Sequence, residues 1–97
     1  MKGPTAKYVD NAFDLKNINA NETDHLIGLF AEGHLPWLDT RMPNQDPSLT
    51  NLTKKAIEIL SKNSDDKGFF LMVEGGRIDH AHHETWANRL IRVHSQF

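Results

Sequence analysis

The clearest periodic pattern of hydrophobic and polar positions lies in residues 46–62. At about 100° per residue, its apolar side chains fall within roughly 160° on one helical face. These residues are Leu49, Leu52, Ala56, Ile57, Ile59 and Leu60, and the opposite side carries Lys54, Lys55, Glu58 and Lys62. Asp46 is predicted to cap the helix, and Pro47 to take its first position, where a missing N–H costs nothing. The polar stretch 63–68 is predicted to end it.

An uninterrupted apolar run follows, from Phe69 to Val73. A run without alternation is typical of a strand that is covered on both faces, as in parallel sheets. A helix followed by such a buried strand predicts an α/β fold. A second short apolar run, Leu26–Phe30, is consistent with another buried strand.

The remaining stretches give weaker signals. Residues 1–25 are mostly polar and are predicted to be loop, with a short strand at Tyr8 and Val9. Three prolines within residues 36–47 exclude a long helix there. A second helix is predicted over residues 80–92, from near His80 to Arg92. Its apolar stripe, which we interpret as core packing, comprises Trp86, Leu90 and Val93.

Composition narrows the class of protein. A chain of 97 residues, 38% of them hydrophobic, corresponds to one small domain or to a piece of a larger one. A net charge of -2 provides no basic stripe for nucleic acid or for an anionic membrane surface. No apolar run is long enough to span a membrane, and none follows Met1 as a secretory signal would. The absence of cysteine excludes disulfides and thiolate zinc sites in this chain.

Candidate chemistry is concentrated in residues 74–84, directly after the predicted buried strand. Ligands of α/β sheets bind beyond the carboxyl ends of the strands, which is where Glu74 lies. Asp79 and His83 are four positions apart, so on a helix they face the same side. A carboxylate and an imidazole on one face can bind zinc, and Glu74 adds an oxygen ligand suited to zinc or magnesium. By spacing alone a solvated helix start explains the same residues, and a zinc site needs a further ligand from elsewhere.

The segment from Gly68 to Glu84 resembles the metal-binding segment of animal alkaline phosphatases. The resemblance extends upstream through Ile27–Phe30 and Asp46–Leu49 and covers roughly residues 6–91, whereas residues 92–97 diverge. It implies that residues 1–97 are a partial alkaline phosphatase domain. The expected fold is therefore an internal fragment of a three-layer α/β/α sandwich.

The resemblance also implies a function. The family hydrolyses phosphate monoesters with zinc and magnesium ions, is dimeric, and is secreted or held by a lipid anchor on the outer cell surface. We therefore expect this chain to be part of such a hydrolase, with a phosphate monoester as substrate and no nucleic-acid partner. The family's serine nucleophile has no match here, since Ser48, Ser61, Ser64 and Ser95 do not lie in its motif. The alternative is a truncated, non-catalytic product that binds a metal or a partner.

Individual residues match positions of the family motif. Glu74 resembles the magnesium ligand, and Asp79 and His83 resemble two zinc ligands. His80 matches a position near the bound phosphate and the surroundings of the magnesium ion. Arg77 is predicted to be structural rather than the phosphate-binding arginine. His82 and Glu84 match the motif without an assigned ligand role.

Two further sites follow from the sequence. The animal enzymes carry a calcium site, and Phe30 and Asp46 match two of its positions, the first through a backbone carbonyl. Ala31 stands where the family has a glutamate, and a helix cap explains Asp46 equally well. Asn21, in Asn-Glu-Thr, is a candidate glycosylation site of a secreted glycoprotein, with chance occurrence as the alternative.

Overall fold

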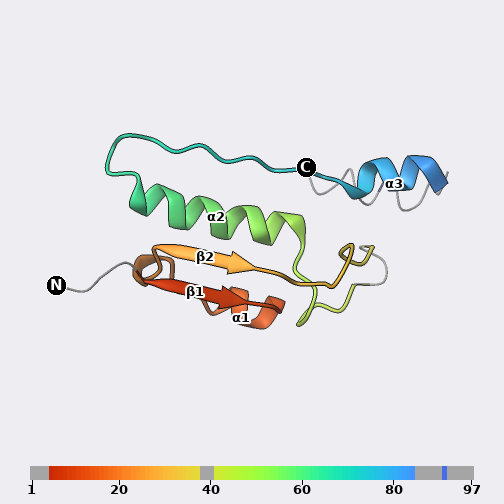
Figure 1. The fold of residues 1–97 in the computed structure, drawn as a ribbon, viewed down its shortest axis with the longest axis horizontal. Coiled ribbons are helices and arrows are strands. Elements are labelled where there is room, and N and C mark those ends of the chain that lie inside the picture. The colour runs from red at the N-terminus through yellow and green to blue at the C-terminus, as the bar shows by residue number, and fades with distance from the viewer. Residues whose placement is uncertain (1–4, 38–40, 85–90, 92–97) are drawn as a thin grey trace.

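The computed structural model describes residues 5–37, 41–84 and 91 of the chain (Figure 1). Its elements follow in the order β1 (Ala6–Val9), α1 (Ala12–Lys16), the 3-10 helix η1 (Ala20–Glu22), β2 (His25–Gly28), α2 (Leu49–Asn63) and α3 (Arg77–Glu84). Strands and helices therefore occur together, which confirms the α/β class at this coarse level. Within the described residues, no helix combines the length and the apolar character needed to cross a membrane.

The two strands pair in parallel, with Ala6 opposite His25 and Val9 opposite Gly28. The predicted strand at Tyr8 and Val9 is confirmed and is longer than expected. The predicted strand at residues 26–30 is also present, but it begins and ends earlier, at His25 and Gly28. It is not buried as predicted, because Ile27 is 62% exposed. A parallel pair needs a crossover connection, and α1 and η1 supply it within the stretch that was expected to be loop.

The predicted amphipathic helix is α2, but its start differs from the prediction. Ser48 is the capping residue, and its hydroxyl accepts a hydrogen bond from the backbone N–H of Asn51 at 3.1 Å. Asp46 does not cap α2, because its carboxylate accepts instead from the N–H of Met42 at 2.9 Å. Pro47 therefore precedes the cap rather than following it, and its ring is buried.

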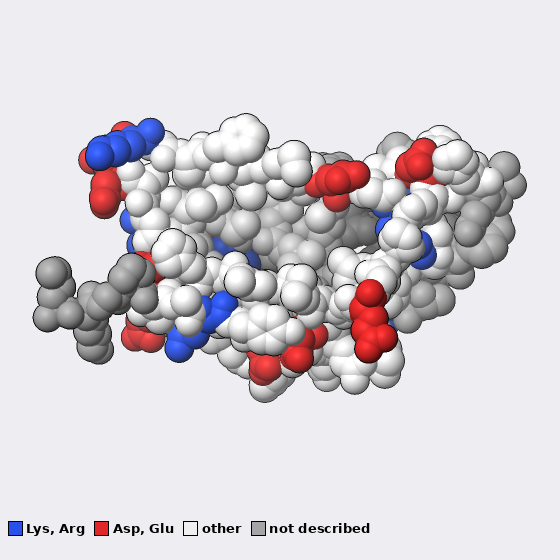
Figure 2. Space-filling model, viewed as in Figure 1, with Lys and Arg blue, Asp and Glu red and all other residues white. Residues whose placement is uncertain are grey.

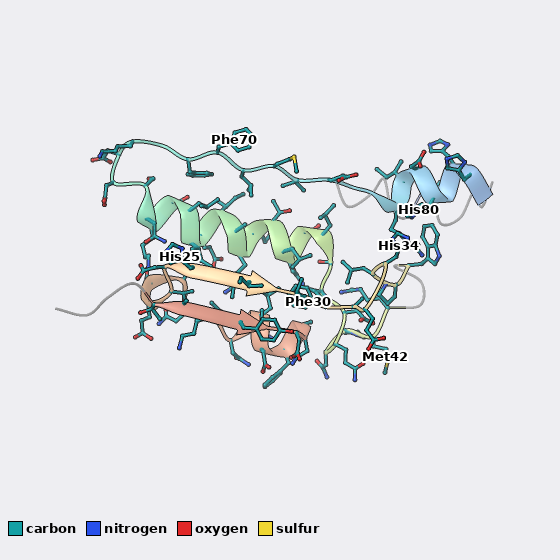
Figure 3. All side chains as sticks on the ribbon, viewed as in Figure 1. His25, Phe30, His34, Met42, Phe70 and His80 are labelled. Atoms are coloured by element: carbon teal, nitrogen blue, oxygen red, sulfur yellow. The ribbon has the colours of Figure 1, made fainter. Side chains whose placement is uncertain are left out.

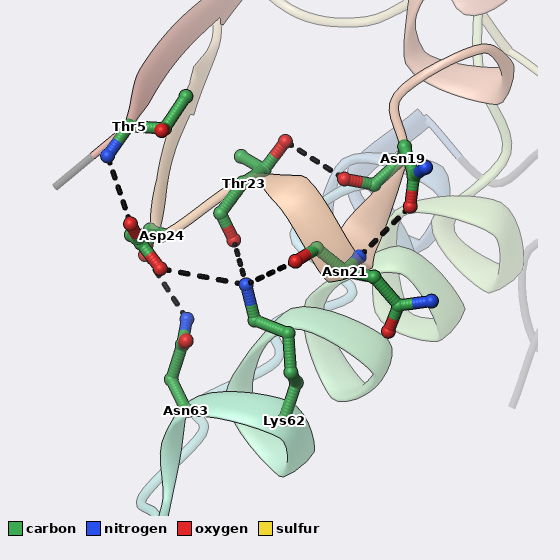
Figure 4. Close-up of polar contacts among 7 residues, drawn as sticks. All are labelled: Thr5, Asn19, Asn21, Thr23, Asp24, Lys62 and Asn63. Carbon is green, nitrogen blue, oxygen red and sulfur yellow. Dashed lines mark hydrogen bonds and ion pairs between the residues drawn. The ribbon is translucent and has the colours of Figure 1, made fainter. Parts of the chain in front are cut away.

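The carboxyl end of α2 is fixed by a group of polar contacts that we call the docking cluster, formed by Asn21, Thr23, Asp24 and Lys62 (Figure 4). The ammonium of Lys62 donates to the backbone oxygens of Asn21 at 3.2 Å and Thr23 at 3.0 Å, and lies 3.4 Å from the Asp24 carboxylate. Thr23 is 1% exposed, and its hydroxyl donates to the carbonyl of Asn19. Part of the charged side of α2 therefore contacts the rest of the chain.

Asp24 also joins the docking cluster to the start of β1. Its carboxylate accepts a hydrogen bond from the N–H of Thr5 at 2.8 Å, and Asn63 donates to its backbone oxygen at 3.2 Å. The bond from Thr5 stabilises the ionised carboxylate and lowers the pKa of Asp24, and Lys62 acts in the same direction. One carboxylate thus ties the sheet to the helix.

The described hydrophobic core is small. Besides Pro47, its buried apolar side chains are Trp37 from the loop after β2, Val9 from β1, Leu15 from α1 and Ile59 from α2. After α2 the chain turns through residues with positive φ, namely Asp65, Asp66 and Gly68. Only glycine adopts that region freely, with aspartate tolerating it better than most residues, so this turn ends the helix as the polar stretch predicts.

The predicted buried strand at Phe69–Val73 is wrong for this structure. The segment is extended but pairs with no strand within the described residues, and it runs along the side of α2 away from the sheet (Figure 1). Phe70 is 87% exposed and Met72 is 76% exposed. A parallel strand needs neighbours for its backbone groups and cover for both faces, and the described chain provides neither. Along the top of Figure 2, an uncharged surface lies between charged side chains at the left and at the right.

The predicted second helix begins earlier than expected, at Arg77 instead of near His80. It is α3, described as far as Glu84, with Asp79 in its first turn. The amide N–H of Ile78 donates to the carbonyl of Gly75 at 3.0 Å, which starts the first turn directly after the Gly75–Gly76 break. Of the remaining predicted length, Ile91 is described and is helical, whereas Trp86, Leu90 and Val93 lie outside the described residues.

Candidate functional site

A cavity of about 500 Å³ lies where the start of α3 meets the loop after β2 and the start of α2. Its lining combines charged and imidazole side chains with apolar ones. They are His34, Leu35, Pro36, Arg41, Pro47, Ser48, Leu49, Glu74, Gly75, Gly76, Arg77, Asp79 and His80. The cavity therefore gathers Glu74, Asp79 and His80, three of the residues to which the sequence assigned a chemical role.

Glu74 reaches this cavity at the end of the extended segment, and its side chain is exposed. Its carboxylate lies beside Gly76, where a Cβ atom would be 3.7 Å from Oε1. That is an ordinary contact distance, so a side chain at Gly76 would touch the carboxylate without a clash. The position of the Glu74 carboxylate therefore does not by itself require glycine at residue 76.

Asp79 and His83 face the same side of α3, as their spacing predicts. Oδ2 of Asp79 and Nε2 of His83 are 3.3 Å apart, and their side chains are 75% and 76% exposed. Two ligand atoms about 2.1 Å from one tetrahedral zinc ion lie about 3.4 Å apart. The pair therefore fits two ligands of one zinc ion, and it equally fits a solvated pair on a helix surface.

The rest of a metal centre is not assembled by the described residues. Residues 5–37 and 41–84 contain no group of three or more carboxylate or imidazole side chains placed to hold one ion. Glu74 and Asp79 line the cavity, whereas His83 is not part of that lining. The donor set fits part of a zinc site and one oxygen ligand for magnesium.

His80 projects from α3 toward the loop after β2, where it meets His34 (Figure 3). The two ring centroids are 4.4 Å apart and the planes are inclined at 65°, an edge-to-face contact. Nη1 of Arg77 lies 3.4 Å from Nδ1 of His80. The guanidinium of Arg77 in turn lies 3.7 Å from the centroid of the Trp37 ring, which is 8% exposed.

Sequence reasoning missed His34 and Trp37. They precede α3 by some forty positions and lie in a proline-containing loop with no periodic pattern. No signal within the loop itself distinguishes them, because their importance comes from contacts with residues far along the chain.

The calcium and glycosylation candidates are not among the residues that line this cavity. Phe30 and Asp46 do not line it, and the Asp46 carboxylate already accepts from Met42. Asn21 is exposed in η1, and Thr23 of the same motif is buried. Both sites stay predictions.

A model of the family described as "Alkaline phosphatase" matches residues 1–97 of this chain. The chain belongs to the alkaline phosphatase family. It is 46% identical over 84 residues to the tissue-nonspecific isozyme of Felis catus, a match that covers 87% of the chain and 16% of that relative. It is 48% identical over 77 residues to the alkaline phosphatase of Gadus morhua, with 79% of the chain and 16% of the relative covered.

An insect relative is similar in the same way. The chain is 44% identical over 82 residues to the membrane-bound alkaline phosphatase of Bombyx mori, which covers 84% of the chain and 14% of that relative. These matches confirm the resemblance inferred from the segment at Gly68–Glu84. The chain spans about a sixth of the length of the alkaline phosphatases it matches. For the feline enzyme, the match covers 16% of the relative's length.

Proposed function

We propose that residues 1–97 form part of a metal-dependent hydrolase of phosphate monoesters. The observation that most supports this proposal is the pair Asp79 and His83. Oδ2 of Asp79 and Nε2 of His83 lie 3.3 Å apart on one face of α3, in a chain that belongs to the alkaline phosphatase family. That separation is close to the edge of a zinc coordination tetrahedron. Glu74 and Asp79 open onto one cavity, so oxygen ligands for two metal ions would lie at a single site.

The roles proposed for the individual residues are those that the resemblance to the family implies. Asp79 and His83 would hold zinc, and Glu74 would hold magnesium. His80, in the cavity wall, would face the phosphate group. When bound, zinc supplies Lewis-acid stabilisation of negative charge on phosphoryl oxygens. The serine nucleophile and the remaining ligands would come from parts of the enzyme outside this chain.

In the intact enzyme we propose that the extended segment at Phe69–Val73 is a strand of a three-layer α/β/α sandwich. Its support is the exposure of Phe70 and Met72, because large apolar side chains in a continuous run favour burial by further strands. A homodimer that is lipid-anchored on the outer cell surface, with a glycan on Asn21, completes the proposal. The exposed position of Asn21 in η1 is compatible with a glycan.

The metal assignment is tested by substituting the two zinc ligands in the intact enzyme that carries these residues. We expect Asp79→Ala and His83→Ala each to lose bound zinc and to reduce hydrolysis of a phosphate monoester by at least about 100-fold, since even losing a ligand's outer hydrogen-bond partner costs 10–100-fold. Zinc content is measured by elemental mass spectrometry beside the rate.

His82→Ala is the matched control, because His82 neighbours His83 on α3 and is also exposed. It should keep both zinc and activity. Full zinc content in Asp79→Ala and His83→Ala would overturn the assignment. A wild-type enzyme that hydrolyses phosphate diesters or sulfate esters but no monoesters would overturn the proposed reaction.

A further inference from the structure

The side chain of Arg77 connects a buried aromatic ring to His80. Its guanidinium carbon lies 3.7 Å from the centroid of Trp37, and its Nη1 lies 3.4 Å from Nδ1 of His80. Its Nε is buried and has no hydrogen-bond acceptor within the described residues. In the part of the chain that the structure describes, Arg77 is held by stacking on Trp37 and by the contact with His80, and no carboxylate pairs with it.

The contact with Arg77 has a chemical consequence for His80. A guanidinium group only donates hydrogen bonds, so Nδ1 of His80 is the acceptor. In the neutral ring the proton then resides on Nε2, which makes that nitrogen a donor. His34 contacts the same ring edge-to-face at 4.4 Å, which limits its rotation. The contacts with Arg77 and His34 thus favour one tautomer and one orientation of His80 in the cavity wall.

We propose that Arg77 and Trp37 are positioning residues that hold His80 with Nε2–H available to an oxygen of the phosphate ester. Trp37 supports Arg77, and Arg77 acts through His80 without itself contacting the substrate. The inference rests on the proposed function, because it takes the ligand of this cavity to be a phosphate monoester. In this proposal Arg77 orients His80 for catalysis, and Trp37 holds the guanidinium of Arg77 in place.

The test is a double-mutant cycle in the intact enzyme, with Arg77→Met and His80→Ala made singly and together. Arg77→Met keeps the length of the side chain but removes its donors and its charge. We expect kcat to fall roughly 10-fold to 100-fold, because displacing a catalytic group lowers the rate by about this factor. KM and zinc content should stay within about twofold of wild type. In the His80→Ala background the same change should cost less than about twofold, because coupled residues are not additive.

Trp37 is tested by a conservative variant, since a smaller aliphatic residue at this buried position would disturb folding. Trp37→Phe keeps an aromatic face for the guanidinium and should retain kcat within about threefold, as cation–π contacts also form on phenylalanine. Lys54→Met is the matched control for loss of a positive charge, because Lys54 is exposed on α2 and does not line this cavity. It should leave both kinetic constants unchanged.

The outcomes separate the two proposals. Additive losses in the cycle, or a raised KM that persists in the His80→Ala background, would mean that Arg77 acts on the substrate or on the fold directly, and would overturn this inference alone. A fall in zinc content parallel to the fall in kcat would overturn it as well. Absence of monoesterase activity in the metal-loaded wild-type enzyme would overturn the proposed function and this inference together.

Discussion

Two regions of the molecule are held in different ways. The sheet–helix unit, residues 5–30 with 49–63, is joined by parallel strand pairing and by the docking cluster around Lys62. The site segment, residues 69–84, contacts the rest of the chain through Arg77 on the ring of Trp37 and through the ring of His80 on that of His34. Its apolar residue Phe70 is exposed. The residues with candidate chemistry therefore lie in the region that contributes least to the core.

The largest expected effect is loss of a core contact in the sheet–helix unit. Ile59 is 6% exposed, so Ile59→Ala should lower the free energy of unfolding by about 2–4 kcal/mol through lost burial and a residual cavity. Denaturant unfolding of the chain measures it. Ile57→Ala, on the same helix at 43% exposure, is the control and should cost well under half as much. Equal costs would mean that α2 is not packed through Ile59.

A second test probes the docking cluster through pH. Bonding to Thr5 and proximity to Lys62 lower the pKa of Asp24, so the folded state favours its ionised form. The resulting stabilisation is present above the ordinary carboxyl pKa and is lost as pH falls through the lower folded value. Asp24→Asn should therefore flatten the dependence of the unfolding midpoint on pH below about pH 4, the ordinary range of an aspartate pKa.

The control for this acid titration is Asp10→Asn, because the Asp10 carboxylate is held only by its neighbour Asn11 on the described surface. It should preserve the slope of the wild-type chain. If Asp24→Asn and wild type lose stability in parallel as the pH falls, Asp24 does not link the sheet to α2.

The smallest expected effect is in the site segment. Because Phe70 is 87% exposed, Phe70→Ser should change the free energy of unfolding of the chain by no more than about 0.5 kcal/mol. Leu71→Ser, at the half-buried neighbouring position, is the contrast and should cost more. In the intact enzyme the same Phe70→Ser change should instead lower the yield of folded protein, since the proposed sandwich buries this ring. A similar small effect in both settings would contradict the proposed strand.

The sequence predicted those parts of the fold that depend on neighbours in the chain. The period of apolar residues located α2, and the polar stretch with Gly68 located its end. It misplaced the cap, because Asp46 and Ser48 are both good capping residues and only the bond from Met42 shows which one is engaged elsewhere.

Features that depend on partners far along the chain were harder to predict from the sequence. The run at Phe69–Val73 has strand composition, yet a strand also requires neighbours that the described chain does not provide. At the site, helical spacing predicted that Asp79 and His83 would lie together. It could not predict that Trp37 and His34 approach Arg77 and His80, because no local pattern encodes a contact across some forty residues.

The reach of Lys62 also bears on the order of folding during synthesis. Its bonds to Asn21 and Thr23 join residues 41 and 39 positions apart. The sheet–helix unit is therefore incomplete until Lys62 has left the ribosome, and Glu74 and the rest of the site segment emerge after it. Since the strand pairing and the bonds of Lys62 need no residue after Lys62, we expect this scaffold to form before the site residues emerge. A pause in translation once Lys62 has left the ribosome would favour that order.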